Sequence, residues 1–415
     1  MSNETTMHVA LPLLLTGAAF LLPAGSTGTD GDEFTWPQWD GPQRNGLSKE
    51  TAWSSAGKEE HLWQTEVGLG YSTVSVAGGR LYTMGYDVEA GLDMIFCLDA
   101  LTGEEIWSHT YESEIWNQAH EGGTVNTPSI DGEVVYTLNR EGNAYCLDAK
   151  TGEVLWHNDL MAEGNTNELE SPTWDFSASP LVLEDELLLN CGRILSLDKK
   201  TGKIKWSSKD YGHAYGTAAA FDLEGEPAIA VLNGAGVGVA SRKDGKELFF
   251  RAFGGSNRGV NAATPIVIED AVFVSSDTKP GGALLAFGDG ELVPVWESRE
   301  MVNAFSGCVR IGEHLYGFDQ SVLKCIDLTG KPMWDARGIG NGAVLGTPDR
   351  LVLMGGTGEL IVAEASPKEF KELSRVKLFD AGQFWSKPIL VNGIIYCRSS
   401  KGMLVARDHR ATARD

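Results

Sequence analysis

The residues best suited to chemistry in this 415-residue chain lie in irregular segments between apolar runs. His120 and Glu121 are adjacent, and His213 lies in a later segment of the same kind. Histidine can act as a base or as a metal ligand near neutral pH. However, adjacent side chains on an extended segment point apart, and no third residue with zinc-ligand spacing accompanies them. The sequence therefore predicts neither a catalytic group nor a metal centre.

A larger set of aromatic, amide and charged side chains occupies the same irregular segments. Aromatic rings beside amides and an arginine suit a planar ligand, a sugar-like ligand or a peptide segment. The same rings could instead plug a central channel and pack against their neighbours. The candidate ligand-binding residues are Tyr71, Trp116, His120, Glu121, Trp174, Asp175, His213, Tyr215, Asn257, Arg258, Asn261, Phe305, Gln383 and Trp385.

A repeated sequence unit must position these segments. The phrase CLDALTGEEIW at 97–107 returns as CLDAKTGEVLW at 146–156 and as SLDKKTGKIKW at 196–206. Weaker copies lie at 239–249, 285–296 and 325–334. Each copy has the pattern of a β-hairpin, because glycine supplies the positive φ of a tight turn and the neighbouring Asp or Thr can bond the turn backbone. We expect the aromatic residue that ends most copies to pack between adjacent units.

A second recurring pattern lies upstream of the copies and adds two more apolar strands. It is seen at 127–138, 179–190, 264–275 and 387–398. Four strands in a unit of about 40 to 50 residues is the pattern of a β-propeller blade. A sandwich does not repeat its sequence, and a β-helix coil is shorter than this unit. The sequence therefore predicts an all-β, eight-bladed β-propeller of four-stranded antiparallel blades.

The ring is predicted to close by pairing the start of the propeller with its end. The segment 384–408 supplies only three strands, whereas Trp63 lies in a lone strand at 61–67. An N-terminal strand that completes the C-terminal blade would hide edges that an open sheet exposes. In a propeller the first strand of each blade lines the axis. The segments before those strands, which carry the candidate residues, should therefore converge on one mouth.

Outside the ring we expect three further segments. Residues 1–26 contain an apolar run followed by small residues, which predicts a signal peptide or an N-terminal anchor, although residues 1–8 lack Lys and Arg. Residues 27–60 form a strap that contains tryptophans, 61–408 form the propeller, and 409–415 form a tail. These features predict export to the periplasm or the outside of a bacterial cell, with no membrane span in the mature chain.

Composition narrows the choice of partners. The 34 basic and 57 acidic residues give a formal charge of −23, which disfavours nucleic acid and anionic lipid. Three of the six cysteines, at 97, 146 and 325, share one position in their repeats, so we expect buried free thiols. The glycines at 234, 236 and 238 precede no helix, and we interpret them as sites of close strand approach rather than as a phosphate-binding loop.

The phrase LDAxTGExxW resembles the repeat of the pyrroloquinoline-quinone (PQQ) type propellers over residues 61–408. The superfamily contains quinoprotein dehydrogenases, which bind PQQ with calcium and oxidise alcohols. It also contains non-catalytic relatives such as the propeller subunit of the bacterial outer-membrane-protein assembly machinery. The segment WPQWDGPQRNGLS is similar to one that precedes such propellers in secreted planctomycete proteins.

Resemblance to the dehydrogenases would imply an adjacent Cys-Cys disulfide and an Asp, a Glu and an Asn around calcium. This chain has no Cys-Cys pair, and no stretch matches the other motifs. We therefore expect a monomeric, non-catalytic binding or scaffolding propeller with no cofactor, whose partner is a cell-envelope protein or a small polar ligand. PQQ with calcium belongs only to the alternative, a PQQ-dependent alcohol dehydrogenase-like enzyme. A glycan-binding propeller is the third hypothesis.

Overall fold

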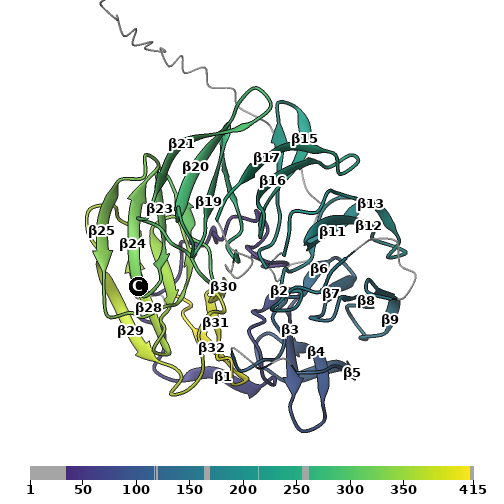
Figure 1. Ribbon diagram of the computed structural model, residues 1–415. Helices are drawn as coiled ribbons and strands as arrows, with labels where there is room; N and C mark the ends of the chain where they lie inside the picture. Colours follow the sequence, from purple (N-terminus) through teal and green to yellow (C-terminus); the bar gives the residue numbers. More distant parts are fainter. Residues whose placement is uncertain are drawn as a thin grey trace, which may run out of the picture. The chain divides into compact units, whose positions relative to one another are not determined.

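A computed structural model describes residues 34–115, 117, 120–162, 169–213, 215–254 and 261–411, all within one compact unit. These residues form 32 strands and contain no helix. The strands make eight four-stranded antiparallel sheets, arranged as the blades of a propeller (Figure 1). The predicted fold class is confirmed. None of the described segments is a helix with the length and hydropathy needed to cross a bilayer.

The first four blades follow one another along the chain. Blade 1 contains β2 (Ser75–Ala77), β3 (Arg80–Asp87), β4 (Leu92–Asp99) and β5 (Glu105–Glu112). Blade 2 contains β6 (Ser129–Asp131), β7 (Val134–Leu138), β8 (Asn143–Asp148) and β9 (Val154–Asp159). Blade 3 contains β10 (Leu181–Val182), β11 (Glu186–Cys191), β12 (Arg193–Asp198) and β13 (Ile204–Ser207). Blade 4 contains β14 (Ala219–Leu223), β15 (Glu226–Asn233), β16 (Gly236–Ser241) and β17 (Glu247–Ala252).

The last four blades include the one that closes the ring. Blade 5 contains β18 (Ile266–Ile268), β19 (Ala271–Ser275), β20 (Gly282–Phe287) and β21 (Leu292–Ser298). Blade 6 contains β22 (Val309–Ile311), β23 (His314–Asp319), β24 (Val322–Asp327) and β25 (Pro332–Ala336). Blade 7 contains β26 (Ala343–Gly346), β27 (Arg350–Met354), β28 (Glu359–Glu364) and β29 (Glu372–Lys377). Blade 8 contains β30 (Ile389–Val391), β31 (Ile394–Arg398), β32 (Met403–Asp408) and β1 (His61–Glu66).

The repeated phrase is the hairpin between the third and fourth strands of a blade. In blade 1, Oδ1 of Asp99 accepts hydrogen bonds from the backbone N–H groups of Leu101 and Thr102, both at 2.9 Å. Gly103 completes the turn with φ = 74°, a conformation that a residue with a Cβ adopts only with strain. The turn fixes the register that places Trp107 opposite Cys97.

The tryptophan that ends the phrase links each such blade to the next. Nε1 of Trp107 in blade 1 donates to the carbonyl oxygen of Ala149 in blade 2 at 3.1 Å. A Cβ added to Gly152, in the turn of blade 2, would lie 2.6 Å from the Trp107 ring. The indole therefore packs directly on the turn backbone of the following blade. The prediction that these tryptophans pack between blades is confirmed.

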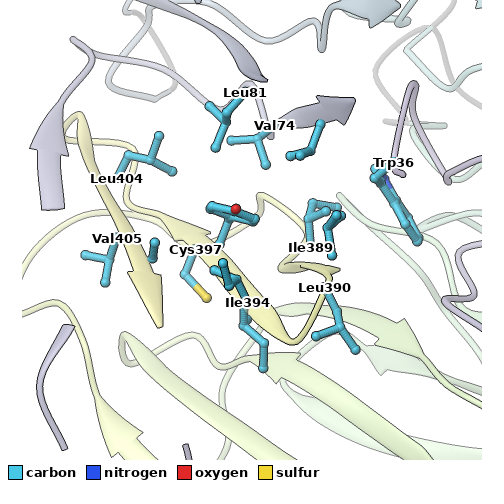
Figure 2. Packing of buried hydrophobic residues seen from close by; sticks show 14 of the residues in the cluster. Trp36, Val74, Leu81, Ile389, Leu390, Ile394, Cys397, Leu404 and Val405 are labelled. Atoms are coloured by element: carbon cyan, nitrogen blue, oxygen red, sulfur yellow. The ribbon is translucent and has the colours of Figure 1, made fainter. Parts of the chain in front are cut away.

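Blade 8 joins the two ends of the ring as predicted. β1 pairs antiparallel with β32, with Trp63 opposite Ala406. Nε1 of Trp63 donates to the carbonyl oxygen of Ala100 in blade 1 at 3.0 Å, which repeats the link between blades 1 and 2. Figure 2 shows the apolar core at this seam, where Leu404 and Val405 of blade 8 lie near Leu81 of blade 1.

Within the predicted strap, the segment from Phe34 to Trp53 contacts the inner strands of several blades. Trp36 forms a β-bridge with Val76 of blade 1, and Leu47 forms one with Gly346 of blade 7. Oε1 of Gln38 accepts a hydrogen bond from the backbone N–H of Val182 in blade 3 at 3.1 Å. The strap thus connects blades that are far apart in the sequence.

The cysteines and the glycine-rich run also follow expectation. All six cysteines are free and buried. A Cβ on Gly236 would lie 2.2 Å from the carbonyl oxygen of Arg251, and one on Gly238 would lie 2.6 Å from the Tyr211 ring. Gly236 and Gly238 lie in β16 and permit the close approach of β17 and of the Tyr211 ring. The glycine run therefore leads into a strand and is not a phosphate-binding loop.

Candidate functional site

The segments before the inner strands converge on a cavity of about 300 Å³. Its wall is formed mainly by aromatic rings and a few hydroxyl side chains. The lining residues are Trp39, Tyr71, His120, Val125, Trp174, Ser177, Ser179, Tyr215, Thr217, Ala262, Phe305 and Trp385. We call this space the aromatic cavity. Because a pocket of this volume is at the small end for ligand sites, it suits one small molecule or one side chain.

Three rings on one side of the aromatic cavity are stacked on one another. The ring centroids of Phe305 and Trp385 lie 3.9 Å apart at an interplanar angle of 10°, and those of Trp385 and Tyr71 lie 4.8 Å apart at 18°. His120 meets Tyr71 edge-on, with centroids 5.2 Å apart. Residues from the segments before blades 6, 8 and 1 therefore form a continuous wall of packed rings.

The strap provides the deep end of the aromatic cavity through Trp39. In the segment before β30, Trp385 lines the wall and Lys387 lies 5.4 Å from the Trp39 ring centroid. After β30, the backbone N–H of Asn392 donates a hydrogen bond to Oε1 of strap residue Glu50. The strap therefore lies further along the inner strands than the wall does. Nε1 of Trp39 also donates to Oγ1 of Thr264 at 3.1 Å, which fixes the indole at the base.

His120 and Glu121 have different environments. Nδ1 of His120 accepts a hydrogen bond from the backbone N–H of Gly122 at 3.0 Å, and burial together with the positive charge of Arg140 lowers the pKa of His120. Burial acts to raise the pKa of Glu121, but hydrogen bonds from Lys401 and Ser400 outweigh it and lower that pKa. At neutral pH the imidazole is therefore uncharged and Glu121 is a carboxylate, 2.8 Å from Nζ of Lys401.

Six of the predicted residues line the aromatic cavity, namely Tyr71, His120, Trp174, Tyr215, Phe305 and Trp385. Gln383 supports the wall, since its Oε1 accepts a hydrogen bond from the Tyr71 hydroxyl. Glu121 follows His120 and is bonded by Ser400. The role of these residues in binding a ligand stays a prediction.

Three other predicted residues have structural contacts away from the lining. Oδ2 of Asp175 lies 3.2 Å from Nη1 of Arg140. Nδ2 of Asn261 donates to the carbonyl oxygen of Asn233 at 2.8 Å. His213 accepts a backbone hydrogen bond from Gly234 and does not line the cavity. Trp116, Asn257 and Arg258 lie outside the described residues.

Sequence reasoning missed six of the lining residues. Five are small or aliphatic side chains in the segments before inner strands, at positions 125, 177, 179, 217 and 262, where no chemical signal distinguishes them. The sixth is Trp39, a residue of the predicted strap that was not among the candidate ligand-binding residues. Its flanking Trp-Pro-Gln-Trp sequence is the signal that could have indicated a buried contact.

The described lining does not fit PQQ with calcium. PQQ is a planar polyanion and needs cationic partners, but among the described lining residues there is neither Lys nor Arg. Arg140, whose charge acts on His120, is bound by Asp175 and Ser113. Calcium takes six or more oxygen ligands, and in the described part of the chain no group of three or more His, Cys, Asp or Glu side chains is arranged so that it could hold a metal ion. We therefore derive no chemical step through this cofactor.

The fold and the cavity define a class: an eight-bladed propeller of the PQQ-repeat type with an aromatic cavity on its axis. The family model described as "Outer membrane protein assembly factor BamB" matches residues 93–327, which is more than half of the chain. The chain belongs to this family. Among curated proteins, none matches the sequence.

Solved structures with a similar fold include an assembly factor, an alcohol dehydrogenase and a designed protein. BamB from Moraxella catarrhalis is 16% identical with a TM-score of 0.61, and the match covers 85% of this chain and 98% of that one. Quinohemoprotein alcohol dehydrogenase from Comamonas testosteroni is 13% identical with a TM-score of 0.64, covering 92% and 82%. The computationally designed Ika8 protein is 13% identical with a TM-score of 0.57, covering 86% and 99%. At these identities the likeness shows the fold alone.

Proposed function

We propose that this protein is an exported, non-catalytic binding module that holds a ligand or a partner's side chain in the aromatic cavity. The observation that carries the proposal is the wall of stacked rings, Phe305, Trp385 and Tyr71, beside about 300 Å³ of space. A concave apolar surface with a few polar groups is the usual form of a binding site. The family description, an outer-membrane-protein assembly factor, supports a place in the bacterial envelope.

The two groups best suited to acid–base chemistry support binding over catalysis. Glu121 accepts hydrogen bonds from Ser400 and is paired with Lys401. One nitrogen of His120 accepts from the backbone of Gly122. A general base must have a nitrogen or oxygen free to take a proton from substrate, and these contacts instead fix the two side chains in the wall. We therefore assign them a positioning role.

Site-specific photo-crosslinking tests the proposal in the producing cell. A benzophenone amino acid in place of Phe305, which lines the aromatic cavity, should give a discrete adduct that mass spectrometry identifies. The matched control carries the same amino acid at Leu155, which is 52% exposed on the outer strand β9. Adducts at position 305 that do not exceed the control would overturn the proposal.

The non-catalytic part of the proposal has its own test. Purified protein is mixed with PQQ and calcium, and the quinone absorption band and dye reduction with alcohols are measured. We expect neither a bound quinone nor dye reduction. Alcohol-dependent dye reduction would show that the protein is a quinoprotein dehydrogenase and would contradict this part of the proposal.

A further inference from the structure

A second cavity, of about 370 Å³, lies between blades 1 and 2, and we call it the interblade cavity. It shares no lining residue with the aromatic cavity. Tyr71 of the aromatic cavity precedes β2, whereas Ala77 of the interblade cavity ends this strand. The two cavities therefore lie at opposite ends of β2. The charged residues that line the interblade cavity are Arg80, Glu133, Asp148 and Lys150.

The next interface along the ring, between blades 2 and 3, has the same framework. In each interface, a tyrosine hydroxyl and a tryptophan Nε1 of one blade donate to the same backbone carbonyl of the following blade. The acceptor is Ala149 of blade 2, at 3.0 and 3.1 Å. In the next interface it is Lys199 of blade 3, at 3.2 and 2.8 Å. Ala149 and Lys199 therefore occupy equivalent positions.

The first hairpins of blades 1 and 2 are equivalent as well. Ala77 pairs with Arg80 at the end of the hairpin in blade 1, and Asp131 pairs with Val134 in blade 2. Between blades 2 and 3, Oδ2 of Asp131 lies 2.5 Å from Nζ of Lys199. Between blades 1 and 2, alanine stands at both of these positions, and both alanines line the interblade cavity. The space that an ion pair fills in one interface is thus open in the other.

The interblade cavity has a cation without an acidic partner. Nη1 of the half-buried Arg80 donates to the carbonyl oxygen of Ala149 at 2.7 Å. Within the described ranges, no carboxylate pairs with Arg80. Between blades 3 and 4, by contrast, Arg242 forms an ion pair with Glu186. Because a guanidinium has five N–H donors in a planar fork that matches a carboxylate, Arg80 has donors left for an acid that enters the cavity.

The two acidic residues of the interblade cavity do not fill the vacant position. The carboxylate of Asp148 accepts the backbone N–H groups of the second and third residues after it, at 2.9 and 2.8 Å. Asp198 makes the same turn contacts, at 3.1 and 2.9 Å, in the interface where Asp131 pairs with Lys199. A turn aspartate is therefore compatible with a second carboxylate in this place. Glu133 is exposed, so water solvates its charge.

From this comparison we infer that the interblade cavity binds a carboxylate group, in the place that Asp131 fills in the next interface. Arg80 holds the carboxylate by charge-assisted hydrogen bonds, and the exposed Lys150 adds a positive charge at the rim. The formal charge of −23 opposes this binding only weakly, because charges more than about 8 Å apart are largely screened at physiological ionic strength. The carboxylate can belong to a free organic acid or to an acidic side chain of a peptide.

NMR titration of the full chain tests the inference with a matched pair of probes. Propionate has the carboxylate of an acidic side chain, and propionamide is its neutral isostere. The reporters are the backbone amides of Gly78 and Gly132, which line the interblade cavity. We expect propionate to bind at least about tenfold more tightly than propionamide. A blocked tripeptide with a central aspartate then distinguishes the sources: tighter binding than propionate indicates a peptide, and equal binding indicates a free acid.

Substitutions at two positions tie binding to the vacant place. Ala77→Asp supplies an internal carboxylate directly opposite Arg80 and should weaken propionate binding at least about tenfold. Ala77→Asn has the same size without the charge and should weaken it less than about threefold. Arg80→Gln should remove the preference for propionate over propionamide. Its matched control is Arg310→Gln: Arg310 pairs with Glu313, its side chain is 28% exposed, and it does not line the interblade cavity.

The outcomes decide the inference independently of the proposed function. Equal binding of propionate and propionamide would overturn it. Propionate binding that Arg80→Gln and Ala77→Asp leave unchanged would place the carboxylate elsewhere and overturn it too. Equal losses in Ala77→Asp and Ala77→Asn would mean that bulk rather than charge closes the cavity, which contradicts the role of Arg80. Crosslinking at position 305 reports on the aromatic cavity and is unaffected by each of these results.

Discussion

Lys387 and Asp40 form a buried ion pair at the base of the aromatic cavity. Their side chains are only 3% and 11% exposed, and the ammonium also lies against Trp39. A buried charge that loses its partner keeps its desolvation penalty, whereas an exposed charge is solvated by water. Loss of this pair should therefore destabilise the attachment of the strap more than loss of an exposed ion pair destabilises the surface.

Asp40→Asn should lower the free energy of unfolding by about 3 kcal/mol, because it leaves Lys387 without a counter-charge. Asparagine is suited to this backbone, where Asp40 has φ = 59°, so the effect isolates the charge. The measurement is urea unfolding followed by tryptophan fluorescence. Glu226→Gln is the control: it breaks a pair with Lys243 whose side chains are both 63% exposed, and should cost less than about 1 kcal/mol. Equal costs would contradict the argument.

Asp93 in β4 is fully buried, and neither of its carboxylate oxygens makes a well-formed hydrogen bond, although the nearby Ser113 hydroxyl acts to lower the pKa of the group. Burial raises the pKa of Asp93 to about 6, although the charge of Arg140 opposes the shift. The folded state therefore binds this proton more tightly than the unfolded state does. The contribution of Asp93 to stability is greatest below its ordinary pKa and is lost as the pH rises to about 6.

Asp93→Asn should therefore stabilise the protein at pH 7 by about 2 kcal/mol, because it removes a buried charge, and the gain should vanish near pH 4. Chemical unfolding of both proteins at intervals across this range measures the difference. Asp335→Asn, at an exposed position on β25, is the control and should leave the pH profile unchanged. If Asp93→Asn is less stable than the parent at pH 7, the carboxylate must have a stabilising partner in solution.

At the scale of single residues, the sequence predicted part of the site. It indicated the large aromatic residues because Tyr71, Trp385 and Phe305 precede inner strands, and the repeat assigned those strands. It could not place Trp39 on the axis, because the path of the strap depends on contacts with blades 1, 3 and 7 that have no local signal. Nor could it separate His120, which lines the cavity, from His213, which does not.

At the scale of the element, the hairpin turn and the tryptophan of the preceding blade form one structural unit. Gly152 has φ = 75°, and an added Cβ would lie 2.6 Å from Trp107. Gly132, in the first turn of the same blade, has φ = 60° with nothing within 4 Å of the added Cβ. The two positions share the backbone requirement and differ in what surrounds them.

Gly132→Ala should cost about 1 kcal/mol, which is the strain of a positive φ on a residue with a Cβ. Gly152→Ala should cost about 2 kcal/mol more, because the methyl group also displaces the Trp107 ring and its hydrogen bond to Ala149. Thermal unfolding of both variants gives the comparison. Equal destabilisation would mean that the turn conformation alone accounts for the conserved spacing between turn glycine and tryptophan within this chain.

The blades were predictable because the same hairpin sequence, with its turn residues and terminal aromatic residue, recurs along the chain. In blade 1, Asp99 and Gly103 specify the turn of the hairpin, and Trp107 specifies its contact with the next blade. Blade 7 lacks the aromatic, with Ser374 opposite Val362, yet it has the same four strands. Its strands are recognisable from their apolar runs alone. Packing against the neighbouring blades therefore suffices to form a blade that lacks the terminal aromatic residue.

At the scale of the whole molecule, ring closure depends on β1, a single strand paired to the end of the chain. Trp63 in β1 and Trp107 in β5 are both 8% exposed and each bonds the next blade. β5 is also joined to β4 by its own hairpin, whereas β1 is not joined to β32 by a turn. Only side-chain and backbone contacts hold β1 in blade 8, whereas in the other blades a turn also joins the last strand to its neighbour.

Trp63→Ala and Trp107→Ala should each lower the free energy of unfolding by about 4 kcal/mol, since both remove a buried indole. Their local effects should differ. In hydrogen exchange, Trp63→Ala should deprotect residues 61–66 and 403–408 well before the rest of the ring, because β1 can detach alone. The exposed edge of β32 should then promote concentration-dependent association, which light scattering detects. Trp107→Ala, as the control, should raise exchange across the blades together; the same pattern in both variants would show that closure is no weaker than any other seam.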